Sequence, residues 1–574
     1  MVFSAFRSVL LLAVVLAAIP IVAGDIWAYQ VSLYLTYGVV ATGLGLAWGM
    51  TGSLSLGHGL YMALSAYLAG NVFMALDGSL LTWPAAVLCA ILPMLVAFVA
   101  SLAVFRGQTG STTSFPMVTL ALALAGGQLA IGWQSVTGGF NGLLGVPPLP
   151  FTDGIIPQYF LVAIVAVVIC AVYAWITAAP LGTVWRAISV DERRLQFLGY
   201  DTALHKALAF SISGLFAGVG GVVYAQQQGI VTPDLTGFAF CGSLLLFVAV
   251  GGRFHILGPI IGALFVGLLS AELRDTVQWW ELVLAVVFIL VVLKFPTGIA
   301  GISKGGSAFQ QKSGTISPPA APVVAKPVSF EMKNVSVRLG SVQILDELDF
   351  RAEDGKTTCI IGPNGAGKSS SFNALTGMLP LTGGTINLDD RELSKRTPVS
   401  LARAGVSRKF QAPTIFASLT IRENLALGLW TKRKTKFALW GMAPWHWHSD
   451  LLTELQTRFP FLEDQDRPAS DLSHGERQVL ELLMVLLTEP RVLLLDEPCA
   501  GLSKDETAAV VELLKWVRVK RGMTIVIVEH DMSLVQSLAD TVNVFHQGKF
   551  LAKGTIEEIR ANNAVQNVYA GGQR

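Results

Sequence analysis

The sequence predicts a two-part fold. An all-α, polytopic membrane domain is expected over residues 1–300, a linker over 301–327, and an α/β P-loop domain with a helical subdomain over 328–574. First, a chain of 574 residues is too long for one compact core. Second, residues 362–369 fit the phosphate-loop pattern G-x-x-x-x-G-K-[ST]. Third, Lys and Arg are scarce in 1–300, where only nine occur: Arg7, Arg106, Arg186, Arg193, Arg194, Lys206, Arg253, Arg274 and Lys294.

The first 300 residues contain many stretches long and apolar enough to cross a membrane. A span needs about 20 mostly apolar residues, and somewhat fewer where helices are broken inside a bundle. About ten stretches fit: 7–24, 29–49, 55–76, 84–105, 114–133, 158–178, 204–226, 239–251, 256–272 and 281–296. Residues 1–24 are alternatively a cleaved signal peptide, since Arg7 precedes an apolar run that ends in small residues.

The positive charges predict the orientation of these spans, because short cytoplasmic loops collect Lys and Arg. With the N-terminus inside, eight of the nine fall in cytoplasmic loops or at cytoplasmic span ends, and only Arg274 lies outside. This orientation also delivers residue 297 to the cytoplasm, where an ATPase must lie. Residues 301–327 are rich in Gly, Ser and Pro, which is typical of a flexible linker.

Composition also argues against some functions. The net charge is +2 and the basic residues form no long stripe, so nucleic-acid binding has little support. The five cysteines are an odd number without metal-ligand spacing, which argues against a disulfide framework. We expect them to be buried packing residues: Cys89, Cys170, Cys241, Cys359 and Cys499.

The phosphate-loop pattern has the sequence context that a nucleotide site requires. An apolar strand is expected at 357–361 before the loop, and a helix whose N-terminus favours anions is expected from Ser369. Lys368 supplies a positive charge, and the Ser369 hydroxyl can bind Mg²⁺. The sequence therefore predicts an ATP or GTP site at Gly362, Pro363, Asn364, Gly365, Ala366, Gly367, Lys368, Ser369 and Ser370.

One cytoplasmic loop, 180–201, is charged yet carries spaced apolar residues at Trp185, Ile188, Leu195 and Leu198. This spacing predicts a short amphipathic helix lying against another cytoplasmic element. A solvated loop is the alternative.

Four motifs in the first half resemble the permease subunit of bacterial branched-chain amino acid importers and their urea and short-chain amide relatives. They are Ser55–Gly59 with Ala66 and Tyr67, Thr137–Gly142, Arg186–Tyr200 and Ile212–Tyr224. The resemblance runs through 30–300 and implies that 181–203 is a coupling helix that docks on an ATPase. As substrate contacts we considered His58, Thr137 and Asn141, with backbone bonding as the alternative for His58.

The second half resembles importer ATPases of the ABC type over 328–570. The resemblance implies that Gln411, in the segment Arg408–Pro413, reaches Mg²⁺ and the attacking water. Asp496 would hold Mg²⁺, Glu497 would polarise the water, and His530 would contact the γ-phosphate. Expected catalytic residues are thus Glu497, His530 and Gln411, and expected metal ligands are Ser369, Gln411 and Asp496. The combination of these residues with a phosphate loop and the signature motif at 472–476 is specific, because GTPases lack the signature motif and kinases lack the phosphate loop.

The segment Leu472–Glu476 resembles the ABC signature, and Ser473 with Glu476 also forms a capping box for a helix. Ser473 and Gly475 would grip the γ-phosphate held by a second ATPase domain. The segments 405–416 and 472–476 resemble urea-type members most closely. Four residues depart from the family pattern: Leu339 replaces a ring that stacks on adenine, His474 and Glu476 replace Gly and Gln, and Ser503 replaces an Asp.

A basic, aromatic insertion is predicted at 430–448, and its Trp and Lys residues suit a surface near the membrane or the permease. His446 and His448 lack a third ligand nearby, so a metal site there is not expected.

Together these features predict an ATP- and Mg²⁺-dependent importer component of the bacterial inner membrane, with a permease and a cytoplasmic ATPase in one chain. The expected solute is a branched-chain amino acid, urea or a related amide. Expected partners are a periplasmic solute-binding protein, membrane lipid, and a second permease and ATPase half, in separate partner chains or in a homodimer. Two alternatives remain open: an ABC exporter, which the short loops oppose, and a membrane ATPase that gates a channel without pumping.

Overall fold

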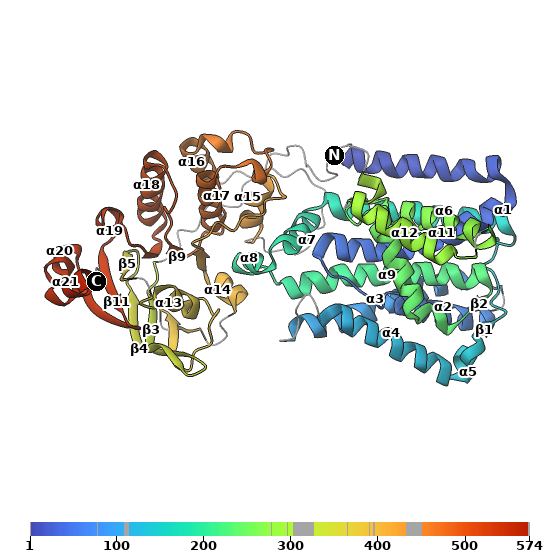
Figure 1. Ribbon diagram of the computed structural model, residues 1–574, viewed down its shortest axis with the longest axis horizontal. Coiled ribbons are helices and arrows are strands. Elements are labelled where there is room, and N and C mark those ends of the chain that lie inside the picture. The colour runs from blue at the N-terminus through green and yellow to red at the C-terminus, as the bar shows by residue number, and fades with distance from the viewer. Residues whose placement is uncertain are drawn as a thin grey trace. The chain divides into compact units, whose positions relative to one another are not determined.

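The computed structural model describes residues 2–76, 78–107, 114–276, 278–295, 297–301, 327–363, 365–389, 391–393, 397–431 and 450–571. The described residues form two compact units (Figure 1). The first contains 2–189 and 202–301, and the second contains 190–201 together with the described residues from 327 onward. Residues 302–326 of the predicted linker (301–327) and residues 432–448 of the predicted insertion (430–448) lie outside the described residues.

The first unit is almost entirely helical. Its longer helices are α1 (Val2–Thr51), α2 (Gly59–Leu76), α3 (Thr82–Arg106), α4 (Ser114–Gly132), α6 (Ile155–Ala178), α7 (Pro180–Val190), α9 (Thr202–Gln228), α10 (Phe238–Gly251), α11 (Gly258–Thr276) and α12 (Trp280–Lys294). Shorter elements are α5 (Gln134–Thr137), η1 (Gly139–Asn141), η2 (Pro233–Thr236), η3 (Ile299–Gly301) and an antiparallel pair, β1 (Leu143–Leu144) and β2 (Ile230–Val231).

The predicted count of about ten spans is not confirmed. In the described part of the chain, six helices are long and apolar enough to cross a membrane: Phe6–Thr51, Gly59–Leu76, Thr82–Arg106, Ser114–Gly132, Ile155–Ala178 and Thr202–Gln228. Two stretches that we expected to be separate spans, 7–24 and 29–49, lie on either side of a kink at Gly24 (φ 77°, ψ −179°), where two helical parts join to form α1. α10 has 14 residues, which at 1.5 Å per residue gives about 21 Å, less than a hydrocarbon core of about 30 Å.

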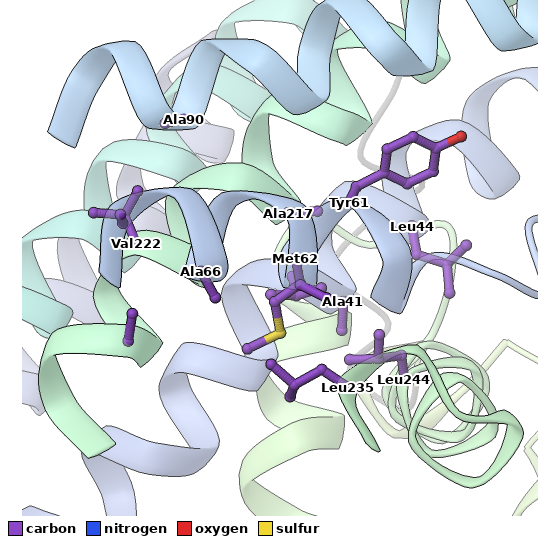
Figure 2. Close-up of a cluster of buried hydrophobic side chains, with 14 of the residues drawn as sticks. Ala41, Leu44, Tyr61, Met62, Ala66, Ala90, Ala217, Val222, Leu235 and Leu244 are labelled. Carbon is purple, nitrogen blue, oxygen red and sulfur yellow. The ribbon is translucent and has the colours of Figure 1, made fainter. Parts of the chain in front are cut away.

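The core of the first unit forms around α9, the most deeply buried of the six candidate spans. Figure 2 shows side chains from α1, α2, α3, α9, η2 and α10 meeting in one cluster, among them Leu44, Met62 and Val222. α9 carries a line of glycines toward its neighbours. A Cβ at Gly218 would lie 2.5 Å from the Ala90 carbonyl oxygen of α3, and one at Gly221 would collide with the Met62 carbonyl oxygen of α2. Small residues therefore set the helix spacing here.

The predicted amphipathic helix around 181–203 is two helices. α7 belongs to the first unit, where Trp185 and Ile188 are buried. Asp191 interrupts the helix because its backbone is extended and its carboxylate accepts a hydrogen bond from the Arg194 N–H, which starts α8 (Glu192–Phe197). α8 belongs to the second unit, where Leu195 and Leu198 are buried.

The second unit contains two sheets. One has six strands in the order β12-β11-β5-β10-β9-β8, with β5, β8, β9, β10 and β11 parallel and β12 antiparallel at the edge. These strands are β5 (Thr357–Ile361), β8 (Val406–Lys409), β9 (Val492–Asp496), β10 (Thr524–Val528), β11 (Thr541–His546) and β12 (Lys549–Gly554). β5, β9 and β10 are buried along their whole length, as parallel strands covered on both faces usually are.

The other sheet is antiparallel, in the order β4-β3-β6-β7. Its strands are β3 (Phe330–Leu339), β4 (Val342–Ala352), β6 (Gly383–Leu388) and β7 (Arg391–Glu392). The helices of this unit, besides α8, are α13 (Lys368–Leu375), α14 (Pro398–Ala404), α15 (Ile421–Trp430), α16 (Asp450–Arg458), α17 (His474–Leu487), α18 (Lys504–Arg521), α19 (Met532–Leu538), α20 (Ile556–Ala561) and α21 (Asn563–Gly571), with 3-10 turns at Pro460–Leu462 and Ala469–Asp471. This is the predicted α/β P-loop fold.

All five cysteines are buried and unpaired, which confirms their expected place in the packing.

Candidate functional site

The predicted site residues of the second unit follow four neighbouring parallel strands. The phosphate loop directly follows β5 and Glu497 directly follows β9, while one residue separates Gln411 from the end of β8 and His530 from the end of β10. The carboxyl ends of parallel strands meet at one edge of a sheet, which is where open α/β sheets bind ligands. The strand order places these four loops at the same edge.

The phosphate loop closes tightly around Lys368. A Cβ at Gly362 would collide with the Phe545 carbonyl oxygen, and Gly367 has a φ of 105°, so glycine is required at both positions. The Lys368 ammonium donates hydrogen bonds to the carbonyl oxygens of Gly362 (2.7 Å) and Pro363 (2.9 Å). Burial lowers the pKa of Lys368, with Glu497 and Asp496 acting against that shift. Asn364 lies outside the described residues.

A cavity of about 520 Å³ lies over this loop. Its size falls in the range of small-molecule pockets. It brings together seven predicted residues, Gly365, Ala366, Gly367, Lys368, Ser369, Ser370 and Gln411, with an eighth, Glu497. It is also lined by residues that the sequence did not suggest: Val342, Gln343, Ile344, Val528, Gln547 and Gly548. Most of these lie in β4 and in the turn between β11 and β12, and no motif marks them.

Three predicted catalytic side chains meet at the rim of this cavity. The Gln411 amide Nε2 donates to Glu497 Oε2 at 2.9 Å, and His530 Nδ1 lies 3.5 Å from Glu497 Oε1. Glu497 adopts a left-handed backbone conformation, with a φ of 47°, that non-glycine residues rarely adopt. Such strain clusters at functional sites. The arrangement can orient a water molecule beside a carboxylate.

Asp496 has a partner that the sequence did not reveal. Its Oδ2 lies 3.2 Å from Arg408 Nη2, and both side chains are almost fully buried. Burial raises the pKa of Asp496, and Arg408 acts against that rise. Arg408 thereby favours the charged form of a carboxylate at a buried strand end. Among the predicted metal ligands, Ser369 and Gln411 line the cavity, whereas Asp496 does not line it and contacts Arg408.

Ser473 and Gly475 lie at the start of α17 and do not line the cavity. The predicted capping box is confirmed: the Ser473 hydroxyl accepts from the Glu476 N–H at 3.1 Å, and the Glu476 carboxylate accepts from the Ser473 N–H at 2.7 Å. Ser503 makes the same arrangement with Glu506 at the start of α18. A serine there can therefore serve as a helix cap in place of the aspartate of the family pattern.

Leu339, the other departure in this region, ends β3 and is about half exposed, outside the cavity lining. Val342 and Ile344 supply the apolar part of the cavity wall near it.

Comparison with known proteins agrees with this geometry. Residues 26–293 match the family described as "Branched-chain amino acid transport system / permease component", and residues 345–500 match the ABC transporter family. The high-affinity branched-chain amino acid transport ATP-binding protein LivG of Salmonella typhimurium is 37% identical over 246 residues, which cover 42% of this chain and 96% of LivG. The chain belongs to the ABC transporter family of branched-chain amino acid transport systems.

Another relative is the ATP-binding protein BraF of Pseudomonas aeruginosa, 34% identical over 254 residues that cover 43% of this chain and 99% of BraF. The crystal structure of a nucleotide-free ATP-binding cassette from an ABC transporter aligns with 42% of this chain and 98% of its own at 26% identity, with a TM-score of 0.36. Because the two family matches follow each other along one chain, this ABC transporter is a membrane permease fused to an ATPase.

A segment from within the permease sequence lies in the ATPase unit of this ABC transporter. We call residues 190–201 the inserted segment; it contains α8. The Arg194 guanidinium pairs with Glu481 of α17 at 3.1 Å, and neither side chain is more than 1% exposed. Phe197 packs edge-on against Phe410, and the Tyr200 hydroxyl donates to the Leu427 carbonyl oxygen of α15 at 2.9 Å.

The three polar residues considered as substrate contacts have different surroundings. His58 is completely buried, and its Nε2 lies 3.4 Å from the Ser213 hydroxyl of α9. The Thr137 hydroxyl donates to the Ala130 and Trp133 carbonyl oxygens, so it is engaged with the backbone of its own turn. Asn141 is exposed at the end of η1. His58 and Thr137 are thus buried within the helical packing, whereas Asn141 is exposed.

Proposed function

We propose that this chain takes up branched-chain amino acids, or a related small amide such as urea, at the expense of ATP. The observation that carries the proposal is the cavity over the phosphate loop, where Lys368, Gln411 and Glu497 converge in a chain that also holds a permease of the branched-chain amino acid family. The LivG and BraF names support the amino acid. The segments 405–416 and 472–476, which resemble those of urea-type members, support a small amide such as urea as the solute.

The residues present fit ATP and Mg²⁺. The phosphate loop and Lys368 would hold the phosphates, while Val342 and Ile344 would contact the base in place of the ring that Leu339 replaces. Ser369, Gln411 and Asp496 would hold Mg²⁺, which supplies charge neutralisation on the phosphates. Glu497 would accept a proton from the attacking water, and His530 would contact the γ-phosphate. Ser473 and Gly475 would close the equivalent site of a second ATPase domain.

We infer the wider arrangement from the family. Components of ABC importers generally work with other subunits and a solute-binding protein. The ATPase unit would lie in the cytoplasm at a bacterial inner membrane, with a second permease and ATPase half and a periplasmic solute-binding protein as partners.

Reconstitution of the complete complex in lipid vesicles tests the proposal. We expect uptake of labelled leucine or urea that requires both ATP and the solute-binding protein. Glu497→Gln should retain nucleotide binding while slowing hydrolysis by a factor on the order of 100, because it keeps the shape but removes the base. Uptake should fall with hydrolysis. The matched control is Glu489→Gln, which alters an acidic residue just before β9 and outside the cavity lining.

The alternatives give different results. Solute flux that is independent of ATP and unchanged in Glu497→Gln would contradict import and support a gated channel. ATP-driven movement in the opposite direction would support an exporter.

A further inference from the structure

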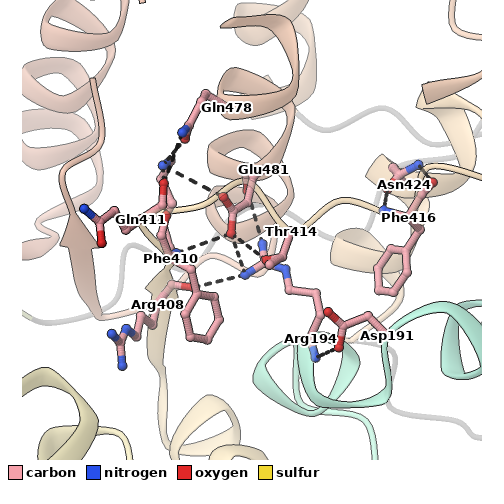
Figure 3. A network of polar contacts seen from close by, with 11 residues as sticks. Asp191, Arg194, Arg408, Phe410, Gln411, Thr414, Phe416, Asn424, Gln478 and Glu481 are labelled. Atoms are coloured by element: carbon pink, nitrogen blue, oxygen red, sulfur yellow. Dashed lines mark hydrogen bonds and ion pairs between the residues drawn. The ribbon is translucent and has the colours of Figure 1, made fainter. Parts of the chain in front are cut away.

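Glu481 of α17 lies at the centre of a buried polar network in the ATPase unit, although it belongs to none of the sequence motifs named above. Its side chain is completely buried and lies seven residues after the first residue of α17, the helix whose start carries the signature segment. Figure 3 shows it at the centre of a network of polar contacts. Two cations point to its carboxylate: Arg194 at 3.1 Å and Lys409 at 3.8 Å, both themselves buried. A buried carboxylate with two buried cations is a costly arrangement that requires every member to be held in place.

The same carboxylate also holds the glutamine loop, as we call the segment Arg408–Pro413 that contains Gln411. Glu481 Oε1 accepts hydrogen bonds from the Phe410 backbone N–H at 3.3 Å and from the Thr414 hydroxyl at 2.9 Å. These two residues flank Gln411 on either side. One turn earlier on α17, the Gln478 amide donates to the Gln411 carbonyl oxygen at 3.1 Å. The backbone around Gln411 is therefore fastened to α17 at consecutive residues.

Gln411 connects α17 with the cavity. Its backbone faces α17, while its side chain donates to Glu497 at 2.9 Å. A change in the position of Glu481 would therefore move the amide that orients Glu497. None of these bonds involves a described residue of the phosphate loop, so nucleotide binding need not change with them.

The inserted segment completes this network from the permease sequence. Besides Glu481, Arg194 donates to the Arg408 carbonyl oxygen at 3.3 Å and lies over the Phe410 ring at 5.9 Å from its centre. Phe197 contacts the same ring at 4.9 Å between ring centres. Arg194 and Phe197 thus both contact Phe410, the residue directly before Gln411.

We propose that Glu481 is a positioning residue for hydrolysis, and that Arg194 of the permease sequence sets the position of Gln411 through it. This deepens the proposed function and rests on it, since it assigns Gln411 a role in hydrolysis. One carboxylate, that of Glu481, thus links the inserted segment, the glutamine loop and α17.

The test uses the complete complex in lipid nanodiscs and measures kcat and KM for ATP hydrolysis, with nucleotide affinity from a fluorescent ATP analogue. Arg194→Met removes the charge but keeps the length of the side chain. We expect kcat to fall by about fivefold or more with KM and nucleotide affinity within about twofold, because a positioning residue acts on the reaction step. Arg193→Met is the matched control: it removes the same charge from an exposed neighbour on α8 and should leave kcat within about 1.5-fold. Arg194→Lys should recover part of the loss.

Two further variants make the test independent of how well Arg194→Met folds. Thr414→Val removes a single hydrogen bond to Glu481 and should lower kcat at unchanged KM. In a double-mutant cycle, Glu481→Gln and Arg194→Met should be non-additive, with the pair losing little more than Glu481→Gln alone, since both break the same contact. Wild-type kcat in Arg194→Met or Thr414→Val, or fully additive losses in the cycle, would overturn the proposal.

The same measurements separate this proposal from the proposed function. Hydrolysis that depends on Arg194 without uptake of leucine or urea would support the positioning role and contradict the solute assignment. Uptake driven by ATP with kcat unaffected by Arg194 would support import and contradict the positioning role. Wild-type hydrolysis rates in Glu497→Gln would contradict both.

Discussion

At the scale of single residues, the buried pair of Arg408 and Asp496 determines when the predicted magnesium ligand carries its charge. Burial raises the pKa of Asp496 while the guanidinium lowers it, so removing the guanidinium should raise that pKa further. A protonated Asp496 cannot assist a cation. As the pH is lowered, we therefore expect Arg408→Met to lose its hydrolytic activity at a higher pH than the wild type does.

The measurement is kcat against pH between about 5 and 8, the range in which most folded domains are stable. Arg403→Met, which removes an exposed arginine of α14, should keep the wild-type profile. An acid limb at the same pH in both variants would show that Arg408 does not act on the titrating group.

Ser503 gives a second prediction at this scale. Its hydroxyl accepts the Glu506 N–H at 3.3 Å and caps α18, so Ser503→Ala should cost about 1 kcal/mol of local helix stability. Hydrogen exchange measured by mass spectrometry should show the first turn of α18 exchanging about fivefold faster, as that free energy implies. Thr507→Ala, one turn further along and not a cap, should exchange as wild type. Equal exchange in both variants would mean that the departure at Ser503 has no capping role.

The residues of the site that belong to sequence motifs could be predicted from the sequence. Gln411, Glu497 and His530 meet because each follows a buried parallel strand, and buried strands followed by charged residues can be read from sequence. Arg408 and Val342 could not be assigned in this way. Their contacts depend on which strands become neighbours, and a single arginine or valine in a strand has no pattern of its own.

At the scale of elements, α9 organises the permease through glycines that allow close helix contact. Gly221→Ala should destabilise the first unit, because the added methyl group would meet the Met62 carbonyl oxygen of α2. Gly242→Ala on α10 is the control, since nothing lies within 4 Å of its added Cβ and alanine favours helix over glycine by up to about 1 kcal/mol.

The measurement is thermal unfolding of the membrane complex in detergent, followed by the loss of its monodisperse peak in size-exclusion chromatography. Gly221→Ala should unfold at a lower temperature than wild type, and Gly242→Ala at the same or a higher one. The reverse order would contradict the close contact between α9 and α2.

Apolar length predicted the helices of the permease well but not their number of crossings. The stretches at 7–24 and 29–49 form the two helical parts of α1, which are joined by a kink at Gly24 and not by a longer loop. The stretch at 239–251 became a helix too short to span. The division of 181–203 into α7 and α8 was also unforeseen, since it rests on the Asp191 carboxylate accepting one backbone N–H.

At the scale of the whole molecule, the ATP site described here has no signature residue in its lining, because Ser473 and Gly475 lie elsewhere in the unit. We therefore expect ATP to bring a second ATPase domain onto the phosphate loop. With Ser473→Cys in this chain and a cysteine in the facing phosphate loop, a short bis-maleimide should crosslink the two domains.

The crosslink should form with ATP in the Glu497→Gln background and decline with ADP. Ser537→Cys, on α19 away from both segments, is the control and should stay uncrosslinked. Equal yields with ATP and ADP, or with either cysteine, would contradict a nucleotide-dependent contact at the signature.

The inserted segment changes how the fusion of the two proteins is understood. The chain leaves the permease unit at residue 189, contributes twelve residues to the ATPase unit, and returns at residue 202, long before it reaches the linker. A protease site introduced at 310–320 should therefore cut the polypeptide without releasing the ATPase. The linker then fixes the ratio of permease to ATPase at one to one and raises their local concentration. Recognition of the ATPase by the permease resides in the inserted segment.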